Sequence, residues 1–372
     1  MVCEGMADEP VPDLDNRTPL ELAKTPWMDS LAKKGRVGFA DFSPRSLPPS
    51  PEVACFSILG FDARQFYTGL GPLEALARGV PQEDGDLVFR CNLVTVMDEV
   101  LVDATSGHIS SKEAVFLIEA LNERLSNESL RFYPNRGYRN ILWMKDSEGL
   151  EEMECLAPKR LLGQNYSKVL PRVHKTGRLA ELVEASKAIL ENQEINRVRI
   201  DLKENPANLV WLWGQGKPLK IPSFRQRTGL AGAAFCNVDF AKGLAKAVDL
   251  EIKEDKKKAL DGKEFVFIHV GHETGMDQST DLKSKIKWIE DFDALVGQVI
   301  RDHEHEEALR IGVTTDCAGS LSKKILLHGH VPFVIQGSGI SADGIEVFNE
   351  KNASQSQWLF AEGAKLMETF LK

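Results

Sequence analysis

The first residues of the chain place an acid where a short apolar run ends. Glu4 and Gly5 follow Val2 and Cys3 and lead into a polar loop. A strand of a parallel sheet can deliver a carboxylate to the sheet edge, and a glycine lets the backbone turn close to a ligand. Carboxylate oxygens suit hard divalent cations. Glu4 is therefore a candidate metal ligand, and a turn or helix-capping role is the alternative.

Histidines near predicted strand ends form a second group that could do chemistry. They are His269, His272, His328 and His330. Four imidazoles gathered at one edge of a sheet could bind zinc. Exposed polar positions explain the same residues equally well, so both interpretations stay open.

Composition limits the kind of protein that carries these residues. The chain has 372 residues, of which 42% are hydrophobic, and a net charge of −9. This length can bury a large core, and the acidic balance argues against a broad nucleic-acid surface. Six scattered cysteines without a C-x-x-C pair indicate reduced thiols. With no long apolar run, we expect a cytoplasmic protein that binds neither nucleic acid nor membrane.

Local patterns predict the elements that must position these residues. Thr18, Pro19 and Glu21 form a capping box with proline at the first helical position, and Thr25-Pro26 repeats the helix start. Apolar runs at 209–212, 233–236, 265–270, 311–315 and 331–336 alternate with helical segments, which is typical of buried parallel strands. A β-α-β pattern between Gly85 and Gly163 predicts a separate small domain.

Three stretches resemble the archaeal-type cofactor-independent phosphoglycerate mutases, a branch of the alkaline phosphatase superfamily. They run from Thr18-Pro19 to Asp29, from Ile58-Leu59-Gly60 through Tyr67-Thr68-Gly69 to Asn92, and from Asn205-Pro206 to Lys217. The resemblance implies an α/β fold: a mostly parallel sheet sandwiched by helices, with a small inserted α+β cap. We expect residues 1–85 and 165–372 to form the core and 86–164 the cap.

The resemblance also implies a serine nucleophile activated by two divalent metals (Mn, Zn or Mg), which interconverts 3-phosphoglycerate and 2-phosphoglycerate. The nucleophile's place falls on Pro51, which has no nucleophilic atom. Ser50 lies one residue away, either as a relocated nucleophile or as an ordinary loop serine. Pro49 and Pro51 restrict its backbone.

Several metal positions of that family are also altered. Glu4 stands for an aspartate, His272 for an aspartate, and Asp316 is retained; the family's histidines fall on Met276, Cys317 and Leu326. Methionine is a poor ligand for a hard cation. The surviving set of Glu4, His272, Asp316 and Cys317 should meet at one sheet edge and hold one metal ion or none. In the bland alternative, Asp316 caps a helix and Cys317 packs.

Substrate-handling positions differ from the resembled family as well. A family arginine falls on Leu70, a histidine on Asn140, and a His-Asp pair on Lys159-Arg160. Arg90, Lys159 and Arg160 are the candidate contacts for a small phosphorylated metabolite. Trp211 and Trp213 are either core residues or part of this pocket.

These replacements favour a catalytically degenerate family member. Losing the nucleophile alone typically lowers a rate by about 10⁶-fold. Two alternatives remain: an active phosphomutase or phosphatase that uses Ser50 and a rearranged metal site, and a non-catalytic binding or regulatory protein that uses the old cleft.

Overall fold

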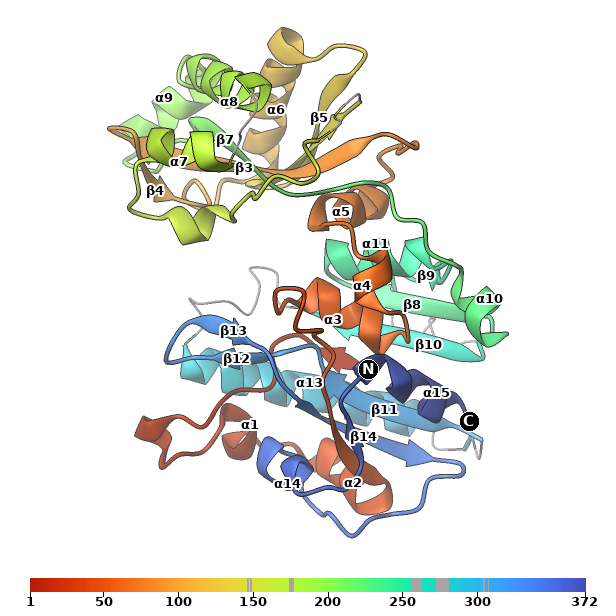
Figure 1. Cartoon of the computed structure of the whole chain (residues 1–372). Helices are drawn as coiled ribbons and strands as arrows, with labels where there is room; N and C mark the ends of the chain where they lie inside the picture. The colour runs from red at the N-terminus through yellow and green to blue at the C-terminus, as the bar shows by residue number, and fades with distance from the viewer. Residues whose placement is uncertain are drawn as a thin grey trace. The chain divides into compact units, whose positions relative to one another are not determined.

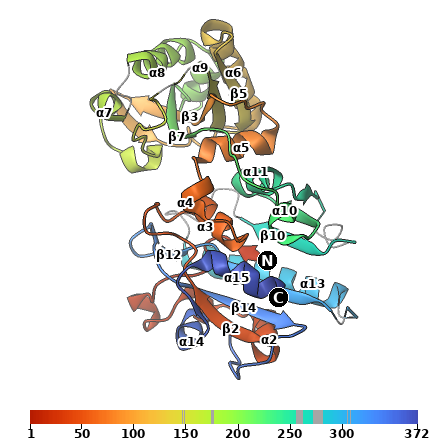
Figure 2. The same cartoon turned by 45° about the vertical axis from the view of Figure 1, so that its right-hand side comes forward.

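A computed structural model describes residues 1–145, 147, 149–173, 177–255, 262–271, 281–303, 305–306 and 308–372. The chain divides into two compact units, Met1–Tyr67 with Ile221–Lys372, and Thr68–Lys220 (Figures 1 and 2). The second unit is therefore wider than the cap expected at 86–164. It takes in residues on both sides because a strand and several helices outside those limits pack on its sheet.

The first unit is built on a sheet of eight strands in the order β15-β2-β14-β11-β1-β10-β8-β9. Five of its neighbouring pairs are parallel, and β14 runs antiparallel to both β11 and β2. The mostly parallel α/β core is thus confirmed, while the parallel direction expected for 331–336 is wrong. The strands are β1 (Val2–Cys3), β2 (Arg36–Ala40), β8 (Gly232–Cys236), β9 (Glu251–Ile252), β10 (Phe265–Val270), β11 (Arg310–Thr315), β14 (Val331–Gly337) and β15 (Leu359–Phe360).

Helices cover both faces of this sheet (Figure 1). One face packs with α1 (Pro19–Leu22), α2 (Pro26–Lys34), α13 (Leu282–Asp302) and α14 (Glu350–Ser354) around a common apolar core. The other elements of the unit are α3 (Pro51–Ile58), α4 (Ala63–Phe66), α10 (Phe224–Thr228), α11 (Asp239–Ala247), α15 (Leu366–Leu371), the short helices η1 (Pro12–Leu14) and η3 (Gly363–Lys365), and the strand pair β12 (Ala318–Ser320) and β13 (Ile325–Leu327).

Sequence signals for helix starts act locally, and the structure bears them out. The Thr18 side chain accepts from the Glu21 N–H, and the Glu21 carboxylate accepts from the Thr18 N–H, which completes the expected capping box. Pro26 occupies the first turn of α2, and Gly35 ends that helix. The Thr18 and Glu21 side chains satisfy N–H donors that a helix terminus leaves without partners.

The second unit is an antiparallel sheet with helices. Its strands β3 (Leu87–Met97), β4 (Val100–Asp103), β5 (Leu130–Arg136), β6 (Arg139–Met144) and β7 (Leu209–Gly216) follow the order β4-β3-β6-β5, with β7 also paired to β3. The run 209–212 was expected as a parallel core strand; it belongs instead to β7, antiparallel to β3. The helices are α5 (Leu70–Arg78), α6 (Ser111–Leu125), α7 (Tyr166–Val173), α8 (Gly177–Leu190), α9 (Glu194–Asp201) and the short η2 (Pro158–Leu161).

Alternate side chains of strand β3 point to opposite faces of this second sheet. Phe89, Cys91 and Leu93 enter the large apolar core that includes residues of α6 and α8. Arg90 and Asn92 alternate with them, so their side chains point to the opposite face. Across the described part of the whole chain, no helix is long and apolar enough to cross a membrane.

Candidate functional site

Three strand ends of the first unit meet where the sequence places its acids. In the register of the sheet, Cys3 of β1 pairs with Val270 of β10 and with Thr315 of β11. The residues that follow are therefore neighbours. The Glu4 N–H donates to the Val270 carbonyl at 2.9 Å, and the Gly5 N–H donates to Asp316 Oδ1 at 2.9 Å. Both carboxylate side chains are buried.

The two carboxylate oxygens of Asp316 have different surroundings. Oδ1 accepts from the N–H groups of Gly5 and Cys317, at 2.9 and 2.7 Å. Oδ2 is buried 3.8 Å from His269 Nε2, and no described residue forms a hydrogen bond with it. Within the described residues, both ring nitrogens of His269 also lack hydrogen-bond partners, although the ring is fully buried. Asp316 thus ties β11 to the loop after β1 and does not cap a helix.

The cysteines around this strand edge are poor metal ligands as they stand. Burial, followed by the charges of Asp316 and Glu4, raises the pKa of the Cys317 thiol well above its ordinary value. Burial followed by Asp316 does the same to the pKa values of Cys3 and Cys55. Because the thiolate is the ligand form, a thiol held neutral binds metal weakly.

Glu4, Asp316 and Cys317 follow the ends of the paired strands β1 and β11, whereas His272 and Met276 lie outside the described residues. Among the residues that are described, no three His, Cys, Asp or Glu side chains are arranged to hold a metal ion. They do not fit the two-metal centre that the resemblance implies. A further donor lies beside Asp316: His269 of β10, whose Nε2 is 3.8 Å from Asp316 Oδ2.

Of the predicted histidine group, the two other described members, His328 and His330, do not converge with His269. His330 stacks on Phe39 with ring centroids 5.6 Å apart, and His328 Nδ1 lies 3.3 Å from the Ser43 carbonyl oxygen. His330 directly precedes β14, and both β11 and β1 lie between β14 and β10 in the sheet. With neighbouring strands about 4.8 Å apart, these imidazoles cannot share one ion with His269.

Helix α3 begins at the place of the family nucleophile. Pro51 is its first residue, and Ser50 is its N-cap with extended backbone, φ −157°. The Ser50 hydroxyl oxygen accepts from the Val53 N–H at 3.4 Å. This is the ordinary capping use of a serine. Leu326, at another altered family position, pairs across β13 and β12 with Gly319.

A buried ion pair that the sequence analysis missed supports the loop after β1. Lys285 Nζ of α13 lies 2.6 Å from Asp8 Oδ2 and donates to the Ala7 carbonyl at 3.2 Å. Both charged side chains are almost fully buried. No local signal could reveal the pair, because 277 positions separate its partners.

The second unit gathers three cations on or beside one sheet face. Arg90 of β3 lies 3.5 Å from Glu74 of α5 and 4.9 Å from the centre of the Trp213 ring. Burial, followed by the charges of Arg139 and Arg90, lowers the pKa of Lys159 to about 8. Lys159 therefore lies near both arginines. We call Arg90, Arg139 and Lys159 the cation cluster.

Two of the three expected substrate contacts, Arg90 and Lys159, belong to this cluster. Arg160 is exposed, and its backbone carbonyl accepts from the Gln164 side chain. Arg139, which the sequence analysis did not select, lies opposite Asn92 across β6 and β3. Asn140 is buried and binds the backbone of the β5–β6 turn.

The two tryptophans of β7 divide between the two expected roles. Trp211 is fully buried, and its indole N–H donates to the Leu156 carbonyl at 2.9 Å. It is therefore a core residue. Trp213 contacts Arg90, and its indole N–H donates to the Asn92 side chain at 3.1 Å, so it lies beside the cation cluster.

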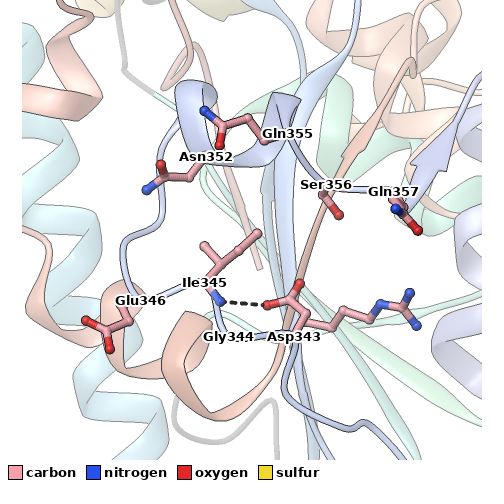
Figure 3. Close-up of a pocket in the computed structure, with 9 residues that line it drawn as sticks. Asp343, Gly344, Ile345, Glu346, Asn352, Gln355, Ser356 and Gln357 are labelled. Carbon is pink, nitrogen blue, oxygen red and sulfur yellow. Dashed lines mark hydrogen bonds between the residues drawn. The ribbon is translucent and has the colours of Figure 1, made fainter.

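A polar cavity of about 530 Å³ lies elsewhere in the first unit (Figure 3). Its lining includes Arg36, Asp343, Glu346, Asn352 and Gln355. Arg36 begins β2, so the cavity is at the opposite sheet edge from Glu4 and Asp316. The Asp343 carboxylate accepts from the N–H groups of Val37 and Ile345, which gives it a structural role.

Comparison with known proteins decides the family. A curated relative from Methanosarcina mazei, "2,3-bisphosphoglycerate-independent phosphoglycerate mutase", is 35% identical over 392 residues, covering 100% of this chain and 98% of the relative. The chain belongs to the 2,3-bisphosphoglycerate-independent phosphoglycerate mutase family. A probable phosphoglycerate mutase of this family from Geobacter sulfurreducens is 34% identical, with coverages of 99% and 98%. The family model of the same description matches residues 32–196.

Solved structures agree on the fold of this mutase family member. The PH0037 protein from Pyrococcus horikoshii has a TM-score of 0.79 at 24% identity, covering 100% of this chain and 95% of its own. The cofactor-independent phosphoglycerate mutase from Thermoplasma acidophilum has a TM-score of 0.60 at 25% identity, with coverages of 100% and 97%.

Replacing Lys285 by methionine should destabilise the protein by about 3–5 kcal/mol, because it leaves the Asp8 carboxylate buried without its counter-charge. Lys287→Met is the matched control on the same helix, since the Lys287–Asp291 pair is largely exposed; its cost should stay below about 1 kcal/mol. Urea unfolding measures both. Equal losses in the two variants would contradict the role assigned to the buried pair.

Stability should also depend on the protonation of Glu350, whose pKa burial raises from 4.5 to about 7. The folded state thus holds this proton to higher pH than the unfolded state does. Its contribution is complete below pH 4.5 and disappears as pH rises through about 7, a change of about 3 kcal/mol at most.

Urea unfolding of wild type and Glu350→Gln between pH 4.5 and 8 measures this contribution. The wild type should lose stability relative to the variant as pH rises. Glu346→Gln, at an exposed position nearby, should run parallel to wild type. If the Glu350→Gln curve also ran parallel to wild type, the buried carboxyl would not titrate in this window.

Proposed function

We propose that this chain is a catalytically degenerate member of the phosphoglycerate mutase family that binds a small phosphorylated carboxylate without efficient turnover. The observation that carries the proposal is the start of helix α3. Pro51 occupies the nucleophile's place, and the neighbouring Ser50 hydroxyl serves as the helix cap.

A serine nucleophile needs a free oxygen, a group that lowers its pKa and donors for the phosphoryl oxygens. Pro51 offers no oxygen and no N–H. The Ser50 oxygen accepts the Val53 N–H, and its extended backbone is set by its place as the residue before the helix. Turning Ser50 into the nucleophile would give up this cap, which typically contributes about 1 kcal/mol.

The strand edge supports at most a single cation in this proposal. Glu4 and Asp316 would be its carboxylate ligands, His272 and Cys317 are the further donors that the sequence offers, and His269 is the donor that the geometry adds. The buried atoms Asp316 Oδ2 and His269 Nε2, which have no hydrogen-bond partner among the described residues, support such an ion. When bound, it would supply charge stabilisation.

The ligand class follows from the cation cluster. Arg90, Arg139 and Lys159 place three positive charges close together, and the neighbouring carboxylate of Glu74 is paired with Arg90. Guanidinium groups bind phosphates and carboxylates through paired N–H donors. The ligand that balances this charge best is an anion with a phosphate and a carboxylate, such as 3-phosphoglycerate.

Mutase turnover in a coupled assay with added manganese should be near background for the wild type and unchanged in Ser50→Ala. The reason is that Pro51 supplies no nucleophile and Ser50 only caps α3. Pro51→Ser alone should not restore activity, because Met276, Cys317 and Leu326 lack the family's ligand atoms. Robust wild-type activity that disappears in Ser50→Ala would show an active enzyme with a relocated nucleophile.

Binding of 3-phosphoglycerate, measured by isothermal titration calorimetry, should survive without turnover and depend on the cation cluster. Arg139→Gln should weaken it by roughly 10–100-fold, as expected for the loss of a hydrogen-bonded charge. Arg131→Gln is the matched control, because Arg131 is an exposed arginine of the adjacent strand β5 that packs on Tyr133. Equal affinities for the two variants would remove the cluster from the binding site.

A further inference from the structure

Arg90 is enclosed by protein groups on two sides. Its guanidinium carbon lies 4.9 Å from the centre of the Trp213 ring, and the Glu74 carboxylate lies 3.5 Å from Nη1. The residue is only 9% exposed, and its Nε has no hydrogen-bond partner among the described residues. A buried N–H of a charged group that lacks a partner carries a desolvation cost, which an anionic ligand would relieve.

The contact between Glu74 and Nη1 leaves another edge of the Arg90 guanidinium group for a ligand. A guanidinium group is planar and carries its N–H donors in a fixed fork. On the edge away from Nη1, Nε and Nη2 present two parallel N–H groups, which match two oxygens of a carboxylate or a phosphate. Because the group is planar, the direction of this edge depends on whatever holds the guanidinium plane.

The Trp213 ring is itself held in place. Trp213 lies opposite Arg90 across β7 and β3, and it packs against the apolar core of the second unit. Its indole N–H donates to the side chain of Asn92, a buried residue of β3, at 3.1 Å. A cation is attracted to the face of an indole ring, so a ring fixed in this way can hold the guanidinium plane.

A β-bulge follows directly after Trp213. Two positions along β3, from Val88 to Arg90, face three positions along β7, from Trp213 to Gly216. Gly214 takes up the extra residue with φ +60°, and a Cβ added there would lie 3.2 Å from the Cβ of Leu70. A bulge bends its strand and changes the direction of nearby side chains. The bulge therefore helps to set the direction of the Trp213 ring.

We propose that Trp213 is a positioning residue of the anion site. Its ring fixes the guanidinium plane of Arg90, so that the edge formed by Nε and Nη2 binds one oxyanion group of the ligand through two parallel hydrogen bonds. The inference rests on the proposed function and adds to it the residue that orients the arginine. Trp213 acts through Arg90, so loss of the ring weakens ligand binding only while the arginine is present.

Isothermal titration calorimetry of the full chain with 3-phosphoglycerate compares two replacements of the ring. Trp213→Leu should weaken binding by about 10-fold, because the cation–π contact is lost, whereas Trp213→Phe keeps an aromatic face and should stay within about 3-fold of wild type. Trp143→Leu is the matched control. Trp143 of β6 is also half-buried, its indole N–H donates to Asp86 at 2.8 Å, and Lys145 lies 5.4 Å from its ring centre. The control should bind 3-phosphoglycerate as wild type does.

A double-variant cycle measures whether Trp213 acts through Arg90. Arg90→Gln removes the charged fork and should weaken 3-phosphoglycerate binding by roughly 10–100-fold. In that background Trp213→Leu should weaken binding by less than about 2-fold more, because the group that the ring positions is gone. Glycerol 3-phosphate, which lacks the carboxylate, identifies the bound group: a ring effect that persists with this ligand assigns the phosphate to Arg90, and one that disappears assigns the carboxylate.

Urea unfolding of each variant checks that the protein is folded when its affinity is measured. Three results would overturn the inference and leave the proposed function intact: additive losses in the double variant, equal losses in Trp213→Leu and Trp213→Phe, or an equal loss in Trp143→Leu. If Arg90→Gln does not fold, the comparison of the three tryptophan variants decides. Wild-type protein that does not bind 3-phosphoglycerate would refute both proposals.

Discussion

The candidate site of the first unit depends on a strand of two residues. Val2 and Cys3 form hydrogen-bonded pairs with β10 on one side and β11 on the other, so β1 lies at the centre of the sheet despite its length. Parallel pairing sets the strand ends level, and this places Glu4 beside Asp316. Three side-chain interactions hold the loop that follows: Asp316 Oδ1, the Thr315 hydroxyl and the Lys285–Asp8 ion pair. Most polar groups at this edge are thereby committed to structure.

These contacts hold the strand edge through protein groups. A catalytic two-metal centre would have its carboxylates turned toward ions, whereas here one oxygen of Asp316 binds backbone N–H groups and the thiol of Cys317 is held neutral by burial. Asp316 Oδ2 and the His269 ring nitrogens are buried, and none of them has a hydrogen-bond partner in the part of the chain that the structure describes. In the second unit, three cationic side chains lie close together. Burial and the charges of Arg139 and Arg90 lower the pKa of Lys159 to about 8.

Local signals in the sequence predicted local structure well. The capping box at Thr18 and the proline-led start of α2 lie where expected, because capping involves residues only a few positions apart. Strand direction and sheet membership were less accessible. An apolar run such as 331–336 shows burial, yet the antiparallel direction of β14 is set by distant partners. The same limit applies to the run 209–212, which was expected as a core strand. In the structure it belongs to β7 and pairs with β3.

The site was predicted to the extent that its residues follow strand ends. Glu4, Asp316 and Cys317 do so, and they meet. The Lys285–Asp8 pair and the approach of Arg139 to Lys159 arise from tertiary packing, which spacing along the chain does not encode. His269 had been grouped with three other histidines; the strand order separates it from His328 and His330 and joins it to Asp316.

The central claim is that this phosphoglycerate mutase family member binds its family's substrate without converting it. Phosphorus NMR tests this most directly, because one spectrum reports binding and conversion together. 3-Phosphoglycerate is incubated with an equal concentration of the protein in a buffer that contains magnesium and no manganese. The account predicts a broadened or shifted 3-phosphoglycerate resonance and no 2-phosphoglycerate after prolonged incubation. Growth of a 2-phosphoglycerate resonance, at a rate that follows protein concentration and is absent in Ser50→Ala, would contradict it.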